Sequence, residues 1–146
     1  MALLVPERAD FASWLAHAGR NRLQLVRLAD HFVSQAAYLT DPDRHGIEIY
    51  RDRPREVWQG RVAERMTTAP LDVKDLFQAQ PESATDSFDG LTTGTVIGHV
   101  HLRATAIPPM VTFYGDLLGF DLMAEFGSSA AFFGADGYHH HFAANT

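Results

Sequence analysis

Histidine side chains gather in the last third of the chain. The sequence has eight histidines, and five of them lie between His99 and His141. His99 and His101 are two residues apart in an apolar run, and His139, His140 and His141 are consecutive. The chain has no cysteine, which excludes disulfides, thiolate catalysis and cysteine-based zinc sites. A metal ion would have to be bound by His, Asp or Glu.

The histidine triplet is the most unusual of these features. If residues 138–144 form a strand, His139 and His141 share one face and His140 lies on the other. The triplet follows Gly-Tyr and precedes Phe-Ala-Ala-Asn, which is not the setting of a purification tag. A neutral histidine suits a metal ligand or a general base. The alternative is a surface cluster that binds metal adventitiously.

Glu48 is a carboxylate within a predicted strand. It lies between Ile47 and Ile49, so strand alternation directs its carboxylate away from both isoleucines. Spacing alone favours an ordinary solvent-facing glutamate, because buried glutamate is rare. Tyr50 follows on the same face, where it would either hydrogen-bond a substrate oxygen or pack in the sheet.

Two other histidines have a functional and a structural interpretation. His99 lies on a predicted strand. Its functional interpretation is a metal ligand, and its structural interpretation is a surface histidine. His101 shares its face and is expected to support the site or the fold. His31 follows Asp30, and its structural interpretation is a turn histidine hydrogen-bonded to Asp30.

Apolar periodicity predicts the same βαβββ pattern twice, hence the α+β class. Neither unit has enough apolar surface to be stable alone, so we expect the two to pack together or on a partner. We expect a module at 1–58, a linker with one short helix (71–78) at 59–94, and a module at 95–146. The predicted strands are 2–5, 23–28, 32–39, 47–50, 96–104, 120–123, 130–133 and 138–144; the predicted helices are 10–18 and 110–118, with Phe11, Trp14, Phe113 and Tyr114 on their buried faces.

The bulk composition narrows the function classes. A net charge of −6 and a pI near 5.7 argue against nucleic acid or an anionic membrane as the partner. The apolar run at residues 2–5 ends at Pro6 and is too short for a signal peptide or membrane span, so a cytoplasmic location is expected. Rossmann fingerprints, P-loops and nucleophile elbows are absent from the sequence, which argues against nucleotide binding and serine hydrolysis.

Several strings resemble the vicinal oxygen chelate superfamily, which contains glyoxalases, bleomycin resistance proteins and dioxygenases. Residues 41–58 resemble the end of the first domain in two-domain catechol-2,3-dioxygenase-like proteins. Residues 97–102 (IGHVHL) resemble the start of the second domain. Residues 114–120 resemble the end of its helix, and residues 137–141 its histidine strand. The chain is thus most similar to the middle portion of such a protein.

The resemblance implies a half-open barrel of paired βαβββ modules around a divalent metal, iron(II) first, with Mn, Ni or Zn as alternatives. It implies ring cleavage of a catechol-type aromatic by dioxygen in a cytoplasmic enzyme, with a homodimer as one of the open assemblies. The alternatives are a glyoxalase-like isomerase or lyase, and a non-catalytic ligand-binding module or inactive fragment. The metal ligands it implies are Glu48, His99 and His139, and the catalytic residues are His141, His31 and Tyr50.

The sequence also departs from the family pattern. The first strand of this module usually begins with a metal-binding histidine, whereas this chain begins Met1-Ala2. Arg44 and His45 replace the usual Gly-Asn turn. Compared with a complete family domain, the two modules are expected in reversed order, as in a circular permutation, because the chain is truncated.

Overall fold

The computed structural model describes residues 1–78 and 88–146, so residues 79–87 of the predicted linker lie outside the described part. A mixed nine-stranded sheet has the order β5-β2-β3-β4-β1-β6-β9-β8-β7. The strands are β1 (Ala2–Leu4), β2 (Leu25–Asp30), β3 (Ser34–Thr40), β4 (Gly46–Asp52), β5 (Ala69–Pro70), β6 (Val96–Arg103), β7 (Asp121–Phe126), β8 (Ala130–Gly134) and β9 (Phe142–Asn145). The helices are α1 (Arg8–Arg20), α2 (Arg55–Trp58), α3 (Val62–Arg65), α4 (Val73–Phe77), α5 (Ile107–Met110) and the π-helix η1 (Val111–Leu117).

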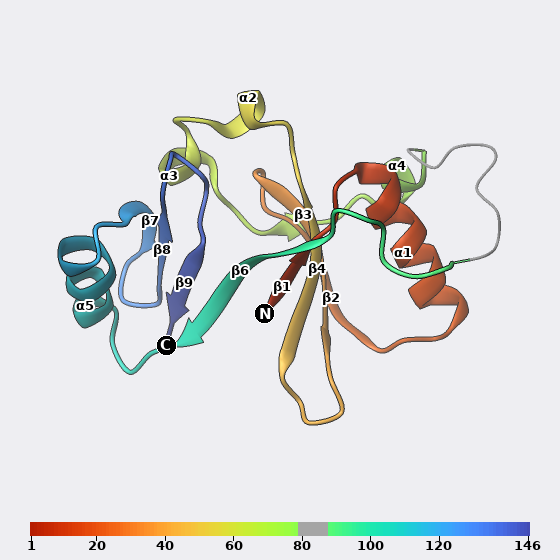
Figure 1. The fold of residues 1–146 in the computed structure, drawn as a ribbon, viewed down its shortest axis with the longest axis horizontal. Helices are drawn as coiled ribbons and strands as arrows, with labels where there is room; N and C mark the ends of the chain where they lie inside the picture. Colours follow the sequence, from red (N-terminus) through yellow and green to blue (C-terminus); the bar gives the residue numbers. More distant parts are fainter. Residues whose placement is uncertain (79–87) are drawn as a thin grey trace.

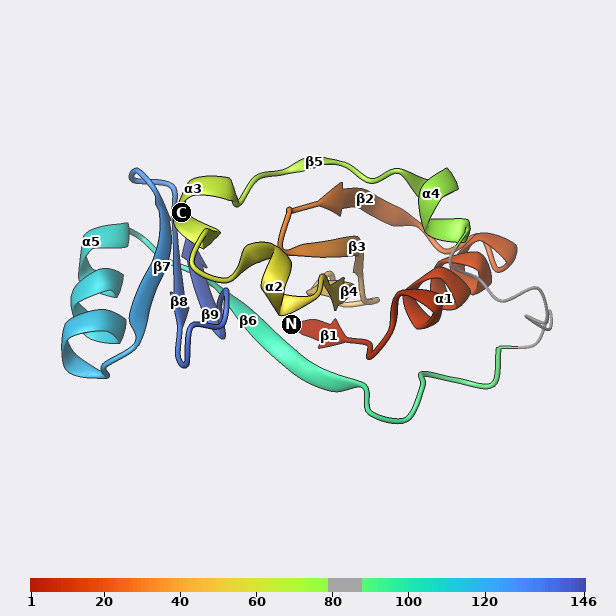
Figure 2. The same ribbon diagram turned by 90° about the horizontal axis from the view of Figure 1, so that it is seen from above.

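The sheet consists of two halves built in the same way. In the first half β1 is parallel to β4, and in the second half β6 is parallel to β9. The antiparallel pairing of β1 with β6 joins the halves into one sheet, which curls so that its two ends face one another (Figures 1 and 2). The predicted α+β class and paired βαβββ half-barrel are therefore confirmed.

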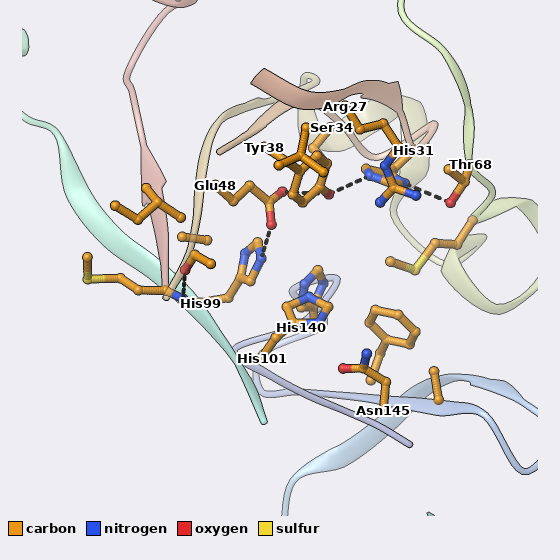
Figure 3. A pocket seen from close by; sticks show the side chains of 18 of the residues that line it. Arg27, His31, Ser34, Tyr38, Glu48, Thr68, His99, His101, His140 and Asn145 are labelled. Carbon is orange, nitrogen blue, oxygen red and sulfur yellow. Dashed lines mark hydrogen bonds and ion pairs between the residues drawn. The ribbon is translucent and has the colours of Figure 1, made fainter. Parts of the chain in front are cut away.

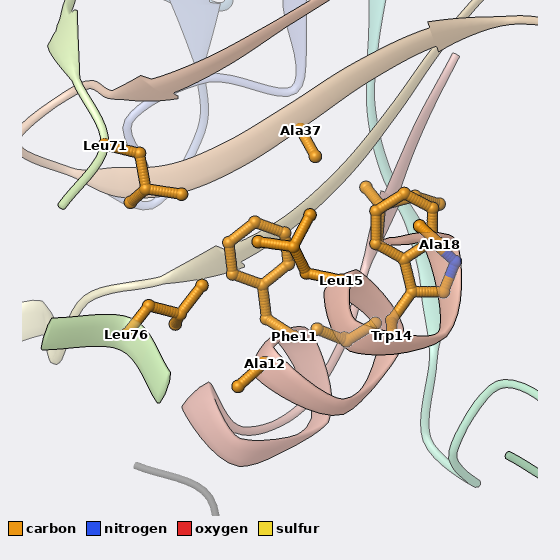
Figure 4. Packing of buried hydrophobic residues seen from close by; sticks show 10 residues of the cluster. Phe11, Ala12, Trp14, Leu15, Ala18, Ala37, Leu71 and Leu76 are labelled. Atoms are coloured by element: carbon orange, nitrogen blue, oxygen red, sulfur yellow. The ribbon is translucent and has the colours of Figure 1, made fainter. Parts of the chain in front are cut away.

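Helix α1 covers the outer face of the first half. It begins at Arg8, two residues before the predicted start, because Asp10 accepts a hydrogen bond from the backbone N–H of Glu7 and closes the first turn. Phe11 and neighbouring apolar residues of the helix pack on Ile49 of β4 (Figure 4). Strand alternation therefore places Glu48 on the opposite, inner face, as its spacing predicted.

The predicted second helix forms as α5 followed by a π-helix. In η1 the N–H of Leu118 bonds to the carbonyl of Phe113, five residues back. This wider turn changes which residues face the sheet, and Phe113 is 49% exposed, so its predicted place in the core is wrong. Tyr114 does pack inward and stacks on Phe142. Ile107 and Phe133 form the centre of the core in this half.

The predicted linker has more structure than expected. Besides α4, it forms α3 and the short strand β5. Together with α2, at the end of the predicted first module, this segment crosses from one half of the sheet to the other and back (Figure 2). Trp58 and Val62 from this segment pack with Val33 of the first half and Ala124 of the second. We call these four residues the bridging cluster. In the described residues, no helix is long and apolar enough to cross a membrane.

The last strand is shorter than predicted. It begins at Phe142 rather than at residue 138, because the preceding residues form a turn. The N–H of Tyr138 donates to the carbonyl of Ala135, and the N–H of His141 donates to the carbonyl of Phe133. The histidine triplet therefore lies in a loop that leads into β9, and strand alternation does not set its side-chain directions.

Candidate metal centre

The curled sheet surrounds a pocket with a volume of about 450 Å³. Both halves of the sheet contribute to its wall, and the polar side chains come from β2, β3 and β4 in the first half and from β6 and the loop before β9 in the second (Figure 3). This volume is in the usual range for small-molecule sites. The lining side chains that could bind a metal or move a proton are His31, Tyr38, Glu48, His99, His101 and His140.

Three of these histidines form a group that could hold a metal ion. His99, His101 and His140 each offer a nitrogen, and the three nitrogens lie within 4.8 Å of one another. His99 and His101 are two residues apart on β6, so they point to the same side of the sheet. The ring of His140 lies 4.2 Å from that of His99, measured between centroids.

The histidines of the group are held in the form that binds metals. Burial lowers the pKa of His140 well below its usual value, and the neighbouring charges of His99, His139 and His101 lower it further. Desolvation by the pocket wall, followed by the charge of His99, also lowers the pKa of His101. Near neutral pH both rings are therefore uncharged, as a metal-ligating histidine must be.

Two residues of the group each have a nitrogen that lacks a hydrogen-bond partner. In the described part of the chain, three buried side-chain nitrogens have none, and two of them are Nδ1 of His99 and Nε2 of His140. Both residues are only 3% exposed. An unsatisfied buried polar atom costs about 1 to 3 kcal/mol. A metal ion bound by these nitrogens would offset that cost, so the residues fit a divalent cation.

Glu48 supports His99 and is not a member of the group. Its Oε2 lies 3.1 Å from Nε2 of His99. Burial alone would raise the pKa of Glu48, but the hydrogen bond from His99 and the charges of nearby histidines lower it overall. The ionised carboxylate accepts the Nε2 proton of His99, so in a ring with one proton Nδ1 is the bare nitrogen.

A hydrogen-bonded chain continues from Glu48 to His31. The hydroxyl of Tyr38 donates to Oε1 of Glu48 at 3.1 Å and lies 2.7 Å from Nε2 of His31. Burial and the charge of Glu48 raise the pKa of Tyr38, so its hydroxyl keeps its proton. Nδ1 of His31 lies 2.8 Å from the carbonyl of Thr67. His31 therefore bonds across the pocket wall and not to Asp30, which was the structural alternative.

The other predicted site residues lie behind the pocket. Tyr50 is fully buried, and its ring packs 4.7 Å from that of His99. His139 is also fully buried and bonds to Asp52 and His140. Nδ1 of His141 accepts the N–H of Ala135 at 3.3 Å, and its ring lies against Phe120 and Tyr138. None of the three lines the pocket.

Of the expected ligands Glu48, His99 and His139, the structure therefore brings only His99 into the group. The other two each hydrogen-bond a histidine that belongs to it. The contributions of His140 and Tyr38 were missed in the sequence. Alternation separated His140 from its neighbours but did not tell which side faces inward. No sequence signal marks Tyr38, which reaches the site because β3 pairs it with Glu48.

The sequence of this chain is similar to those of known proteins. Residues 96–146 match the family described as the Glyoxalase/Bleomycin resistance protein/Dioxygenase superfamily. The chain is 40% identical to a catechol-2,3-dioxygenase of Bacillus subtilis (strain 168) over 149 residues, which include 99% of this chain and 50% of the relative. The chain thus spans about half the length of the curated relative it matches.

Two solved structures share 18% identity with the chain and cover 99% of it. One is an Mn(II)-bound glyoxalase from Novosphingobium aromaticivorans, with a TM-score of 0.34 over 40% of that protein. The other is a 2,2',3-trihydroxybiphenyl 1,2-dioxygenase from Sphingomonas wittichii strain RW1, with a TM-score of 0.30 over 46%. Scores this low carry no weight for the fold or the activity. The resemblance to the glyoxalase/bleomycin resistance protein/dioxygenase superfamily is confirmed by the family match over residues 96–146 and by the sequence similarity to the Bacillus subtilis relative.

Proposed function

We propose that this chain carries a divalent-metal centre for extradiol-type ring cleavage of a catechol-type aromatic by dioxygen. The observation behind the proposal is the group of His99, His101 and His140 on the wall of a pocket large enough for an aromatic ring. Imidazole nitrogens suit iron, nickel and zinc. We assign the three histidines as the ligands of iron(II), with Glu48 and His139 orienting two of them.

The remaining wall of the pocket suits an aromatic substrate. Phe126 and Phe132 provide an apolar surface next to the histidines, and Phe132 lies edge-on to His140 with ring centroids 5.1 Å apart. Such a surface binds the face or edge of an aromatic ring and excludes water from the site. The similarity to a catechol-2,3-dioxygenase supports the same class of substrate.

His31 and Tyr38 are the residues we propose for proton handling. When bound, iron(II) would supply Lewis acidity toward the catechol oxygens and electrons for dioxygen. Catechol must lose a proton to bind in this way. The ring of His31 lines the pocket and connects through Tyr38 to the Glu48 carboxylate, so a proton accepted by His31 is stabilised by the negative charge at the end of the chain. His141 and Tyr50 do not line the pocket, so this proposal gives them no catalytic role.

Glu48 favours a second candidate, a glyoxalase-like isomerase or lyase. Its lowered pKa keeps an ionised carboxylate in the pocket wall, and a carboxylate there could remove a proton next to a carbonyl group. This chemistry needs no redox-active metal. Turnover of such a substrate by zinc-loaded protein, without dioxygen, would favour it over ring cleavage.

The proposal is tested by anaerobic iron(II) titration followed by catechol and air. We expect stoichiometric binding by the wild type and a yellow ring-opened product. In His140→Ala we expect iron(II) affinity to fall at least tenfold and product formation to be lost, because a ligand is removed. His45→Ala is the matched control, since His45 is exposed and pairs only with Asp41 on a turn.

Three results would contradict the proposal. Equal iron(II) affinity in the wild type and His140→Ala would show that the proposed metal centre does not bind iron(II). Tight iron(II) binding without product would leave a metal-binding module with no ring-cleaving activity. Catechol binding that does not change when iron(II) is omitted would indicate a ligand-binding module that needs no metal.

A further inference from the structure

Behind the histidine group, a second chain of hydrogen bonds ends at His140, a member of that group. Oδ1 of Asp52 lies 2.7 Å from Nε2 of His139. Nδ1 of His139 lies 2.8 Å from Nδ1 of His140. Nε2 of His140, at the other side of its ring, is buried without a partner. Asp52 and His139 do not line the pocket.

We propose that Asp52 and His139 are positioning residues that fix the tautomer of His140, so that Nε2 offers its lone pair to the metal. This inference deepens the proposed function and rests on its metal centre. It concerns two residues that would not touch the metal or the substrate. It also gives the expected ligand His139 a different role, one hydrogen bond behind the ligand.

The direction of the hydrogen bonds follows from counting protons. A carboxylate only accepts, so Nε2 of His139 donates to Asp52. The neutral His139 ring then has a bare Nδ1, which accepts the Nδ1 proton of His140. With that proton on Nδ1, a His140 ring with one proton has a bare Nε2, the nitrogen that has no hydrogen-bond partner. The opposite tautomer would leave a buried N–H with no acceptor.

The surroundings hold this chain in place. The hydroxyl of Tyr138 donates to Oδ2 of Asp52 at 2.8 Å, so each carboxylate oxygen has a partner. His139 is fully buried, and Trp58 packs edge-on against it with ring centroids 5.2 Å apart. A rigid second layer of this kind fixes both the tautomer and the orientation of a metal ligand.

The chain also crosses the junction between the two halves of the sheet. Asp52 is the last residue of β4 in the first half, whereas His139 and His140 belong to the second half. The tautomer of His140 is therefore set only when the halves are packed together. Glu48, also on β4, orients His99 of the second half in the same manner. Carboxylates of the first half thus orient histidines that all belong to the second half.

The deciding variant is Asp52→Asn. Its oxygen would accept from Tyr138, and its amide would then donate to Nε2 of His139. This reverses each bond, so His139 donates from Nδ1 and the proton of His140 moves to Nε2, where a metal would bind. Loss of such a supporting contact typically lowers metal affinity about 10- to 100-fold. The matched control is Asp41→Asn, which removes a carboxylate that is hydrogen-bonded to the exposed His45.

Two measurements test the inference. Long-range ¹H–¹⁵N NMR of the metal-free protein reports the tautomer of His140, with the proton expected on Nδ1 in the wild type and on Nε2 in Asp52→Asn. Zinc titration at fixed pH is expected to show the loss of affinity in Asp52→Asn and in His139→Phe, but not in Asp41→Asn. Circular dichroism checks that each variant is folded.

A wild-type His140 with its proton on Nε2 would overturn the inference, and so would Asp52→Asn with unchanged tautomer and zinc affinity. If Asp52→Asn fails to fold, His139→Phe with wild-type zinc affinity overturns it. These readouts need neither catechol nor dioxygen. A protein that shows the expected tautomers but opens no ring would therefore contradict the dioxygenase proposal and leave this inference standing.

Discussion

At the scale of single residues, the proposed metal centre depends on histidines such as His140 that remain uncharged. His140 achieves this by burial, because its ring is surrounded by other histidines and aromatic side chains and has little contact with water. Glu48 achieves the opposite, since bonds and charges from neighbouring histidines outweigh its burial and keep it ionised. The site thus combines neutral ligands with a charged supporting group, which is the combination a divalent cation requires.

The lowered pKa of His140 predicts how the metal-free protein responds to acid. The unfolded chain takes up a proton near the usual pKa of 6.5, whereas the folded chain does not. Stability is therefore complete above pH 6.5 and falls as the pH is lowered toward the folded-state pKa, by about 1.4 kcal/mol per pH unit for one such group. Urea unfolding with chelator between pH 7.5 and 5.5 measures this slope.

We expect His140→Gln to make that slope smaller, because one group that titrates only on unfolding is gone, while His101 and His141, whose pKa values are also lowered, keep their contributions. His45→Gln is the control, because it replaces an exposed histidine. Measurements stop at pH 5.5 because Glu48, with a lowered pKa, adds its own loss of stability below its usual value of 4.5. An identical slope in the wild type and His140→Gln would show that this residue does not carry the effect.

At the scale of elements, β6 must pass very close to β1 and β4 to bring its histidines into the pocket. Gly98 makes this approach possible, because a Cβ there would lie 1.8 Å from the hydroxyl oxygen of Tyr50 and 3.0 Å from Cβ of Leu4. The glycine is needed for space, since its φ is ordinary. Tyr50 in turn packs on His99, so the fit of β6 and the position of a ligand are connected.

Gly98→Ala is therefore expected to lower the free energy of unfolding by about 1 to 3 kcal/mol, as is typical for overpacking a core. Its zinc affinity is expected to fall as well, because moving Tyr50 disturbs His99. Gly46→Ala on β4 is the matched control, since no atom lies within 4 Å of the Cβ that would be added. Chemical denaturation and zinc titration of both variants measure the difference. Equal stability of the two variants would mean that β6 has room at this position.

At the scale of the whole molecule, the two halves form one continuous structure. The β1–β6 pair joins them along the sheet, and the bridging cluster joins them again around Trp58. The core of the first half contains Trp14, and these are the two tryptophans of the chain. Each tryptophan therefore reports on a different region, one within a half and the other between the halves.

We predict that both regions unfold in a single transition. Trp58→Phe leaves Trp14 as the fluorescent reporter of the first half, and Trp14→Phe leaves Trp58 as the reporter of the bridging cluster. For each variant, the denaturant midpoint measured by fluorescence should coincide with the midpoint measured by far-UV circular dichroism, as in a two-state transition. A variant in which Trp58 fluorescence changes before the circular dichroism signal would show that the halves separate before they unfold.

The sequence by itself determined the elements and most of their faces. Apolar periodicity located both βαβββ units, and alternation placed Glu48 opposite Ile47 and Ile49, because these patterns depend only on local backbone geometry. The histidine-rich strings carry the resemblance that the family match over residues 96–146 supports. Local patterns did not reveal the π-helix that turns Phe113 outward, because its hydrogen bonding departs from the helical period that was assumed.

Only the tertiary structure decided which histidines could share a metal. His140 enters the group and His139 lies behind it because the triplet is in a loop, where direction depends on contacts with Asp52 and not on alternation. Asp52 lies 87 positions from His139, and Glu48 lies 51 positions from His99. Such pairs are formed by the packing of two halves that are distant in sequence, and no local pattern contains that information.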